Sequence, residues 1–133
     1  MVNHFQEYAE KLAQLLKDRA WTDVEHLAET LYSVWKERRK VFLCGNGGSA
    51  GNAIHIANDF LYGIGHGSQP GLDVEALTAN PAILTCLAND IDYNSIFSMQ
   101  IQVKGGASDL LIVLSGSGNS QNVIRALQAA KQK

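Results

Sequence analysis

The sequence lacks the segments that would place the chain in a membrane or in an oxidising compartment. No apolar run approaches the ~18 residues that a membrane span needs, and the opening "MVNHFQEYAEKLAQLL" has no apolar centre of the kind found in signal peptides. Only two cysteines occur, Cys44 and Cys86, with no C-x-x-C motif. Both stand among apolar residues, so we expect two buried, reduced thiols. These absences favour a cytoplasmic protein without membrane contacts.

Charge and proline are also scarce. Charged residues make up 18% of the chain, the formal net charge is -2, and there are 2 prolines. The basic stretch at residues 36–40 has the pattern of a solvated helix end, so direct binding of nucleic acid is disfavoured. The 46% of hydrophobic residues excludes a disordered chain, and 133 residues suffice for a single domain.

Two amphipathic helices are predicted before the first strand, at residues 4–18 and 22–38. The second begins with a capping box, in which the Thr22 hydroxyl accepts the amide proton of Glu25. His4 and His26 are expected on the surface of these helices. The apolar faces have two possible roles: they pad the domain, or they pair with another subunit.

From residue 40 onward, strands and helices alternate. Asn80 and Pro81 have the residue types of an N-cap and a first helical position. Strands joined by helices run parallel, so the pattern predicts an α/β fold, a three-layer α/β/α sandwich with a parallel sheet after two N-terminal helices. The expected strands are 41–44, 74–77 and 110–114, and the expected helices are 50–62, 81–88, 95–103 and one starting at Gln121.

Two of the strands are followed by loops of glycine, serine and asparagine that lead into helices. These are "GNGGS" at residues 45–49 and "SGSGNS" at residues 115–120. In an open α/β sheet, ligands bind beyond the carboxyl ends of the strands. Glycine-rich turns and helix N-termini offer backbone N–H groups, and serine adds hydroxyl donors. The pair of loops therefore predicts a phosphate-binding site.

The two loops also fit roles that involve no shared phosphate. Gly45, Gly47 and Ala50 fit a relaxed dinucleotide-binding fingerprint, but Thr78 stands where that fold needs an acid for the ribose. A P-loop is excluded because no Gly-Lys-Ser/Thr occurs. The loops can also be simple tight turns, with Ser49 and Ser120 as N-caps.

The motifs resemble a known family. "GNGGSA" after a strand, "HIA" on the following helix, "LTCLAND" and "SGSGNS" with "NVIRAL" are together similar to the sugar isomerase (SIS) domain, a flavodoxin-like fold. The resemblance spans residues 5–131 and is greatest to the phosphoheptose isomerase subgroup. It implies an enzyme that converts sedoheptulose 7-phosphate to D-glycero-D-manno-heptose 7-phosphate and that forms a homo-oligomer, a dimer or tetramer.

The resemblance also implies which residues contact the sugar phosphate. They fall in the first loop, in the "ND" pair and in the serine-rich loop. The substrate-binding residues are Asn46, Gly47, Gly48, Ser49, Asn89, Asp90, Ser115, Gly116, Ser117 and Ser120.

His55 and Asp59 match the family's catalytic and zinc-binding pair on the helix after the first loop. Positions i and i+4 share one helical face, and imidazole and carboxylate are suitable zinc ligands. The resemblance therefore implies that both residues serve in catalysis and as metal ligands, with zinc as the cofactor. Asp59 replaces the family's glutamate, whose carboxylate reaches one methylene further.

The family also continues past the equivalent of Lys133, with further strands and a helix that completes the isomerase site. The chain is thus expected to be a fragment of a longer isomerase or a shortened homologue, and His66 is the one loose candidate for a missing ligand. The alternative function is a non-catalytic SIS module that binds a sugar phosphate or a protein, of the kind that associates with replication initiators.

Overall fold

The computed structural model describes residues 2–64 and 69–133, so His66 lies outside the described residues. The chain divides into two compact units, Met1–Thr30 and Leu31–Lys133. None of the helices within the described ranges is long and apolar enough to cross a membrane.

The first unit contains α1 (Val2–Asp18) and the beginning of α2 (Thr22–Lys36), as the sequence predicts. The predicted capping box is wrong. The amides of Val24 and Glu25 both donate to the carbonyl of Trp21, at 2.9 Å each, because Thr22 is already the first helical residue. Its hydroxyl therefore has no position from which to cap the helix.

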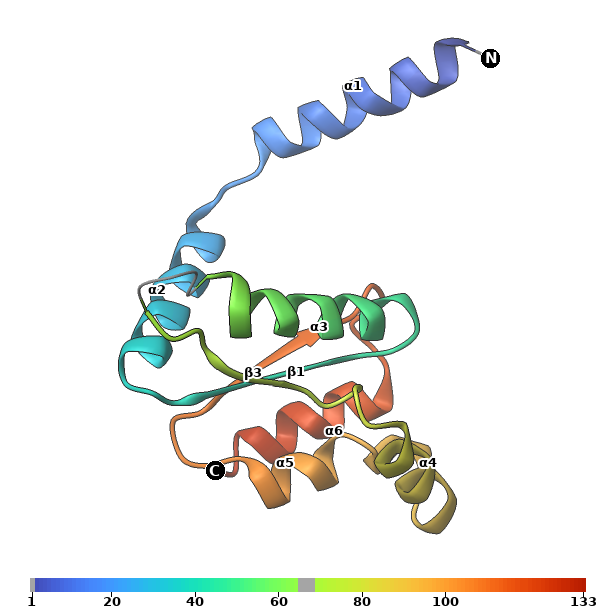
Figure 1. Cartoon of the computed structure of the whole chain (residues 1–133). Helices are drawn as coiled ribbons and strands as arrows, with labels where there is room; N and C mark the ends of the chain where they lie inside the picture. The colour runs from blue at the N-terminus through green and yellow to red at the C-terminus, as the bar shows by residue number, and fades with distance from the viewer. Residues whose placement is uncertain (1, 65–68) are drawn as a thin grey trace. The chain divides into compact units, whose positions relative to one another are not determined.

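The second unit is built on a parallel three-stranded sheet, which confirms the predicted fold class. The strand order is β2 (Asp73–Ala76), β1 (Lys40–Gly45), β3 (Leu110–Leu114). Helix α3 (Gly48–Asn58) covers one face of the sheet, and α5 (Ser98–Lys104) and α6 (Gln121–Ala130) cover the other (Figure 1).

The central strand explains why both faces are covered. Val41 and Leu43 pack with Val34 of α2 and Ala53 of α3, whereas Phe42 and Cys44 pack with residues of α5 and α6. Because successive side chains point to opposite faces, a strand buried on both sides reads as a continuous apolar run. Helix α4 (Pro81–Asp90) packs on the same side as α5 and α6.

Several predicted boundaries shift. The helix expected at 50–62 begins at Gly48 and continues from Asp59 as a π-helix, η1 (Asp59–Gly63). The helix expected at 95–103 is divided into a 3-10 turn, η2 (Tyr93–Ser95), and α5. The predicted cap is confirmed, since the Asn80 side-chain oxygen accepts the Ile83 amide at 3.2 Å.

The prediction of two buried thiols is half wrong. Cys44 is buried in β1, but Cys86 is exposed. Leu84, Leu87 and Ala88 provide the inward face of α4, so Cys86 lies outside the stripe that packs on the core.

Candidate functional site

The two glycine- and serine-rich loops begin side by side at the carboxyl edge of the sheet. In the parallel register Gly45, the last residue of β1, pairs with Leu114, the last residue of β3. The backbones approach so closely here that a Cβ on Gly45 would lie 2.7 Å from the Leu114 carbonyl oxygen and 2.8 Å from Ser49 Cβ. A glycine at this position therefore lets both loops leave the sheet together.

The first loop turns directly into α3. Gly47 is the N-cap and has a φ of 55°, in the left-handed region that favours glycine. Ser49 is already inside the helix, with its amide donating to the Asn46 carbonyl at 3.0 Å, so the alternative in which Ser49 is the N-cap is wrong. The exposed Gly47 and Gly48 place backbone N–H groups at the start of the helix, where anions bind.

The second loop is organised by its own serines. Ser115 Oγ accepts the Gly118 amide at 3.0 Å, and Ser117 Oγ accepts the Asn119 amide at 3.3 Å. Each hydroxyl still has a proton to donate. Ser120 is the N-cap of α6 by position, but its side chain makes no capping hydrogen bond. The loop thus presents hydroxyl donors at a second helix N-terminus.

A buried carboxamide that the sequence reasoning missed connects the loops. Asn122, in the first turn of α6, exchanges two hydrogen bonds with Asn46, at 2.8 and 2.9 Å. The Tyr93 hydroxyl also donates to Asn46 Oδ1, at 3.1 Å. An asparagine at a helix start has no feature that distinguishes it in the sequence, so only the structure identifies this role.

Asn89 and Asp90 lie exposed at the end of α4. Asn89 Nδ2 donates to Asp90 Oδ1 at 2.7 Å, and Cys86 Sγ donates to Asp90 Oδ2 at 3.4 Å. The hydrogen bonds from Asn89 and then Cys86 lower the pKa of Asp90, while the same carboxylate raises the pKa of the Cys86 thiol. Within the described ranges, neither Asn89 nor Asp90 hydrogen-bonds to either loop.

His55 and Asp59 are brought together as the spacing predicts. His55 Nε2 lies 3.4 Å from Asp59 Oδ2, and the two side chains are 78% and 55% exposed. In the part of the chain that the structure describes, no cluster of three or more His, Cys, Asp or Glu side chains could hold a metal ion. The pair is therefore accessible to a ligand but supplies only two metal donors.

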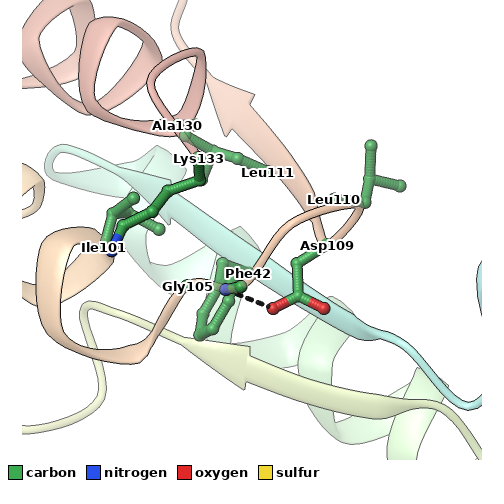
Figure 2. Close-up of a pocket in the computed structure, with 9 residues that line it drawn as sticks. Phe42, Ile101, Gly105, Asp109, Leu110, Leu111, Ala130 and Lys133 are labelled. Carbon is green, nitrogen blue, oxygen red and sulfur yellow. Dashed lines mark hydrogen bonds between the residues drawn. The ribbon is translucent and has the colours of Figure 1, made fainter.

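A small cavity lies at the opposite end of the sheet, beside the first residue of β3, and has a volume of about 20 Å³ (Figure 2). That is room for about one water molecule. Asp109 at its edge is engaged, because its carboxylate accepts the amides of Lys40 and Gly106 at 2.9 and 2.8 Å. The cavity is too small for a sugar phosphate.

The fold and the loops define an α/β protein with two small-residue loops at one edge of its parallel sheet. The family model described as "SIS domain" matches residues 4–133, and the chain belongs to this family.

Among its relatives, the chain is 42% identical to a phosphoheptose isomerase of Aneurinibacillus thermoaerophilus over 110 residues, which cover 83% of this chain and 55% of the relative. It is 37% identical to phosphoheptose isomerase 2 of Campylobacter jejuni over 131 residues, which cover 98% of this chain and 65% of the relative. The chain thus spans between about half and two thirds of the length of these relatives.

Solved structures agree in fold. The phosphoheptose isomerase GmhA from Neisseria gonorrhoeae superimposes with a TM-score of 0.82 at 34% identity, covering 98% of this chain and 67% of that one. A phosphoheptose isomerase from Francisella tularensis gives a TM-score of 0.88 at 27% identity, with 98% and 68% covered.

Proposed function

We propose that the protein is a phosphoheptose isomerase that converts sedoheptulose 7-phosphate to D-glycero-D-manno-heptose 7-phosphate. The observation that carries the proposal is the pairing of Gly45 with Leu114 at the carboxyl ends of β1 and β3, because the two loops then begin at the same edge of the sheet. The first turns of α3 and α6 and the hydroxyls of Ser115 and Ser117 follow these two positions along the chain, so both sets of donors begin at the same edge of the sheet. A phosphate ester is the ligand that such donors suit. The relatives named phosphoheptose isomerase support the same substrate class.

The chemistry assigns roles to His55 and Asp59. An aldose–ketose exchange moves a proton between C1 and C2 through an enediol, which needs a base at carbon and an acid at the carbonyl oxygen. The Asp59 carboxylate is the candidate base, and the His55 imidazole, 3.4 Å away, is the candidate partner in proton transfer. The loops would hold the phosphate and so fix the reacting carbons in place.

Zinc binding is a further proposal, and the described residues do not complete its site. Zinc in proteins is bound by three or four side chains, and His55 with Asp59 provides two. Additional ligands would have to come from outside the described residues or from another chain. No step of the proposed reaction is therefore assigned to the metal.

The test is an assay of sedoheptulose 7-phosphate for formation of the aldose, with Asp59→Asn as the matched control. We expect turnover by the protein and loss of turnover in the variant, with substrate affinity retained because the loops are unchanged. Absence of turnover together with absence of binding, in a folded sample, would contradict the proposal.

A second candidate is a sugar-phosphate-binding or protein-binding SIS module without catalysis. The observation that favours it is the site pair itself, since His55 and Asp59 are both exposed and the carboxylate is the shorter one. Binding of sedoheptulose 7-phosphate without aldose formation would support this candidate over the enzyme.

We also propose self-association and a cytoplasmic location. Helix α1 carries an exposed apolar stripe of Phe5, Tyr8, Leu12, Leu15 and Leu16, and exposed stripes of this size favour burial against another surface. Sedimentation of the purified protein tests the first proposal, and fractionation of cells tests the second.

A further inference from the structure

The carboxamides of Asn46 and Asn122 form a closed pair. Asn46 Nδ2 donates to Asn122 Oδ1 at 2.9 Å, and Asn122 Nδ2 donates back to Asn46 Oδ1 at 2.8 Å. The Asn122 side chain is buried, with 2% of its surface exposed. Because each amide both gives and accepts a proton, the pair fixes the orientation of both side chains.

A third segment joins this pair. The Tyr93 hydroxyl donates to Asn46 Oδ1, and Tyr93 opens η2, which follows α4 and its terminal Asn89 and Asp90. The segments that follow β1, α4 and β3 therefore meet at one carboxamide, that of Asn46.

The contact between η2 and α6 is reinforced next to the pair. Arg125 of α6 donates to Asp92 at 2.9 Å and to the hydroxyl of Ser95 at 3.0 Å. Both groups are charged at neutral pH, and the hydrogen bond from Arg125 lowers the pKa of Asp92 further. The segment that carries Tyr93 is thus held against the helix that carries Asn122.

The hydrogen-bonding capacity of Asn46 is almost fully used. Its side-chain oxygen already accepts two protons, from Asn122 and Tyr93, and its backbone carbonyl accepts the amide of Ser49. We infer that Asn122 and Tyr93 are positioning residues that lock Asn46 and thereby set the spacing between the two phosphate-binding loops. The inference deepens the proposed function and rests on it for the identity of the ligand.

The inference predicts that Asn122, which does not contact the ligand, controls the affinity of the protein for the sugar phosphate. Asn122 is buried, and within the described residues its side-chain oxygen accepts, besides the proton from Asn46, only the amide of Val123 in its own helix, so its side-chain hydrogen bonds reach the first loop through Asn46 alone. Loops that must contact one phosphate together lose affinity when their separation changes, because charge-assisted hydrogen bonds need donor–acceptor distances of about 2.7–2.9 Å.

The experiment compares Asn122→Ala with Gln100→Ala in titrations with sedoheptulose 7-phosphate. Gln100 is the control, because it is another buried carboxamide: it donates to the carbonyls of Leu77, in the turn after β2, and Ile96, directly after η2, and in the part of the chain that the structure describes it makes no hydrogen bond to either phosphate-binding loop. Both variants are expected to lower the melting temperature, but only Asn122→Ala is expected to weaken affinity, by roughly tenfold. Equal affinity of the two variants would overturn the inference.

A double-variant cycle tests the pair itself. If Asn122 acts through Asn46, then Asn46→Ala combined with Asn122→Ala weakens binding no more than the stronger single variant does. Additive losses would overturn the inference.

Tyr93 is exposed, so Tyr93→Phe provides a variant that keeps the fold and removes one hydrogen bond. It is expected to weaken binding by a smaller factor, and unchanged binding in this variant would count against the role of Tyr93.

A measurement without ligand separates this inference from the proposed function. The amides of Ser49 and Gly118 are hydrogen-bonded within the first and second loop, respectively. Asn122→Ala should speed their hydrogen exchange, while Gln100→Ala should leave it unchanged. If the wild-type protein does not bind sedoheptulose 7-phosphate, the proposed function fails. The exchange rates still decide the inference, and unchanged exchange in Asn122→Ala overturns it.

Discussion

Gly45 and Leu114 are partners in the parallel register of β1 and β3, and each is the last residue of its strand. The two loops that follow them therefore leave the sheet at the same level. A Cβ at Gly45 would lie 2.7 Å from the Leu114 carbonyl oxygen, so this shared exit depends on the absence of a side chain. The proposed sugar-phosphate site depends on this relationship.

Gly45→Ala tests the close approach. We expect a loss of about 1–3 kcal/mol in the free energy of unfolding, because the added methyl group overlaps backbone and Ser49. Gly51→Ala is the control, since a Cβ there meets nothing within 4 Å and lies in α3. That variant should gain about 0.5–1 kcal/mol from the higher helix propensity of alanine. Denaturant unfolding of both measures the difference, and equal effects would contradict the account.

Ser117→Ala tests the hydroxyl donors of the second loop. We expect the affinity for sedoheptulose 7-phosphate to fall by about 1–2 kcal/mol, the scale of a hydrogen bond to a charged group. Ser108→Ala removes a hydroxyl from the turn before β3, at the other end of that strand, and should leave affinity unchanged. Calorimetric titration measures both. If Ser117→Ala binds as well as the wild type, the phosphate is held elsewhere.

Asp59→Glu tests the reach of the proposed base. The resemblance to phosphoheptose isomerases implies glutamate at this position, and one added methylene would extend the reach of the carboxylate. We expect kcat to rise, by up to about a hundredfold if the shorter side chain misplaces the base by ~1 Å. Asp59→Asn should lose activity. If kcat is the same as in the wild type in both Asp59→Glu and Asp59→Asn, Asp59 has no role in the mechanism.

The two thiols should differ in reactivity toward iodoacetamide, a neutral reagent. Burial raises the pKa of Cys44 to about 12, so this thiol should stay unmodified in the folded protein. Cys86 is exposed, but the hydrogen bond and charge of Asp90 raise its pKa and reduce its thiolate fraction at pH 8. One cysteine should therefore react, and slowly.

Asp90→Asn removes the charge that raises the pKa of Cys86, so we expect alkylation at pH 8 to become severalfold faster. Asp73→Asn, at an exposed carboxylate in β2, is the control and should not change the rate. Mass spectrometry follows the modification. A rate that is the same in Asp90→Asn as in the wild type would show that the carboxylate does not act on the thiol.

The sequence was sufficient for the sheet because buried parallel strands have a distinctive pattern. The runs at β1 and β3 are continuously apolar, and the glycines after them mark where the strands end. Helix termini were harder to place. A glycine with a φ of 55° caps α3 where the pattern suggested a serine, and no local signal marks the change to a π-helix at Asp59.

The site could be predicted only where chemistry follows from residue type. Glycine and serine in loops after strands indicate an anion site, and the i, i+4 spacing correctly pairs His55 with Asp59. The contacts of Asn122 and Tyr93 with Asn46 are long-range, separated by 76 and 47 residues in sequence. The periodicity of a single sequence does not reveal such contacts, because they depend on how the segments after β1, α4 and β3 come together in the fold.

The most direct test of the central claim is a titration of isotope-labelled protein with sedoheptulose 7-phosphate, followed through the backbone amide resonances of both loops. If the loops hold one phosphate together, the amides of Gly47–Ser49 and of Gly116–Gly118 shift along the same binding curve with one Kd. Shifts confined to a single loop, or two curves with different Kd values, would contradict the claim.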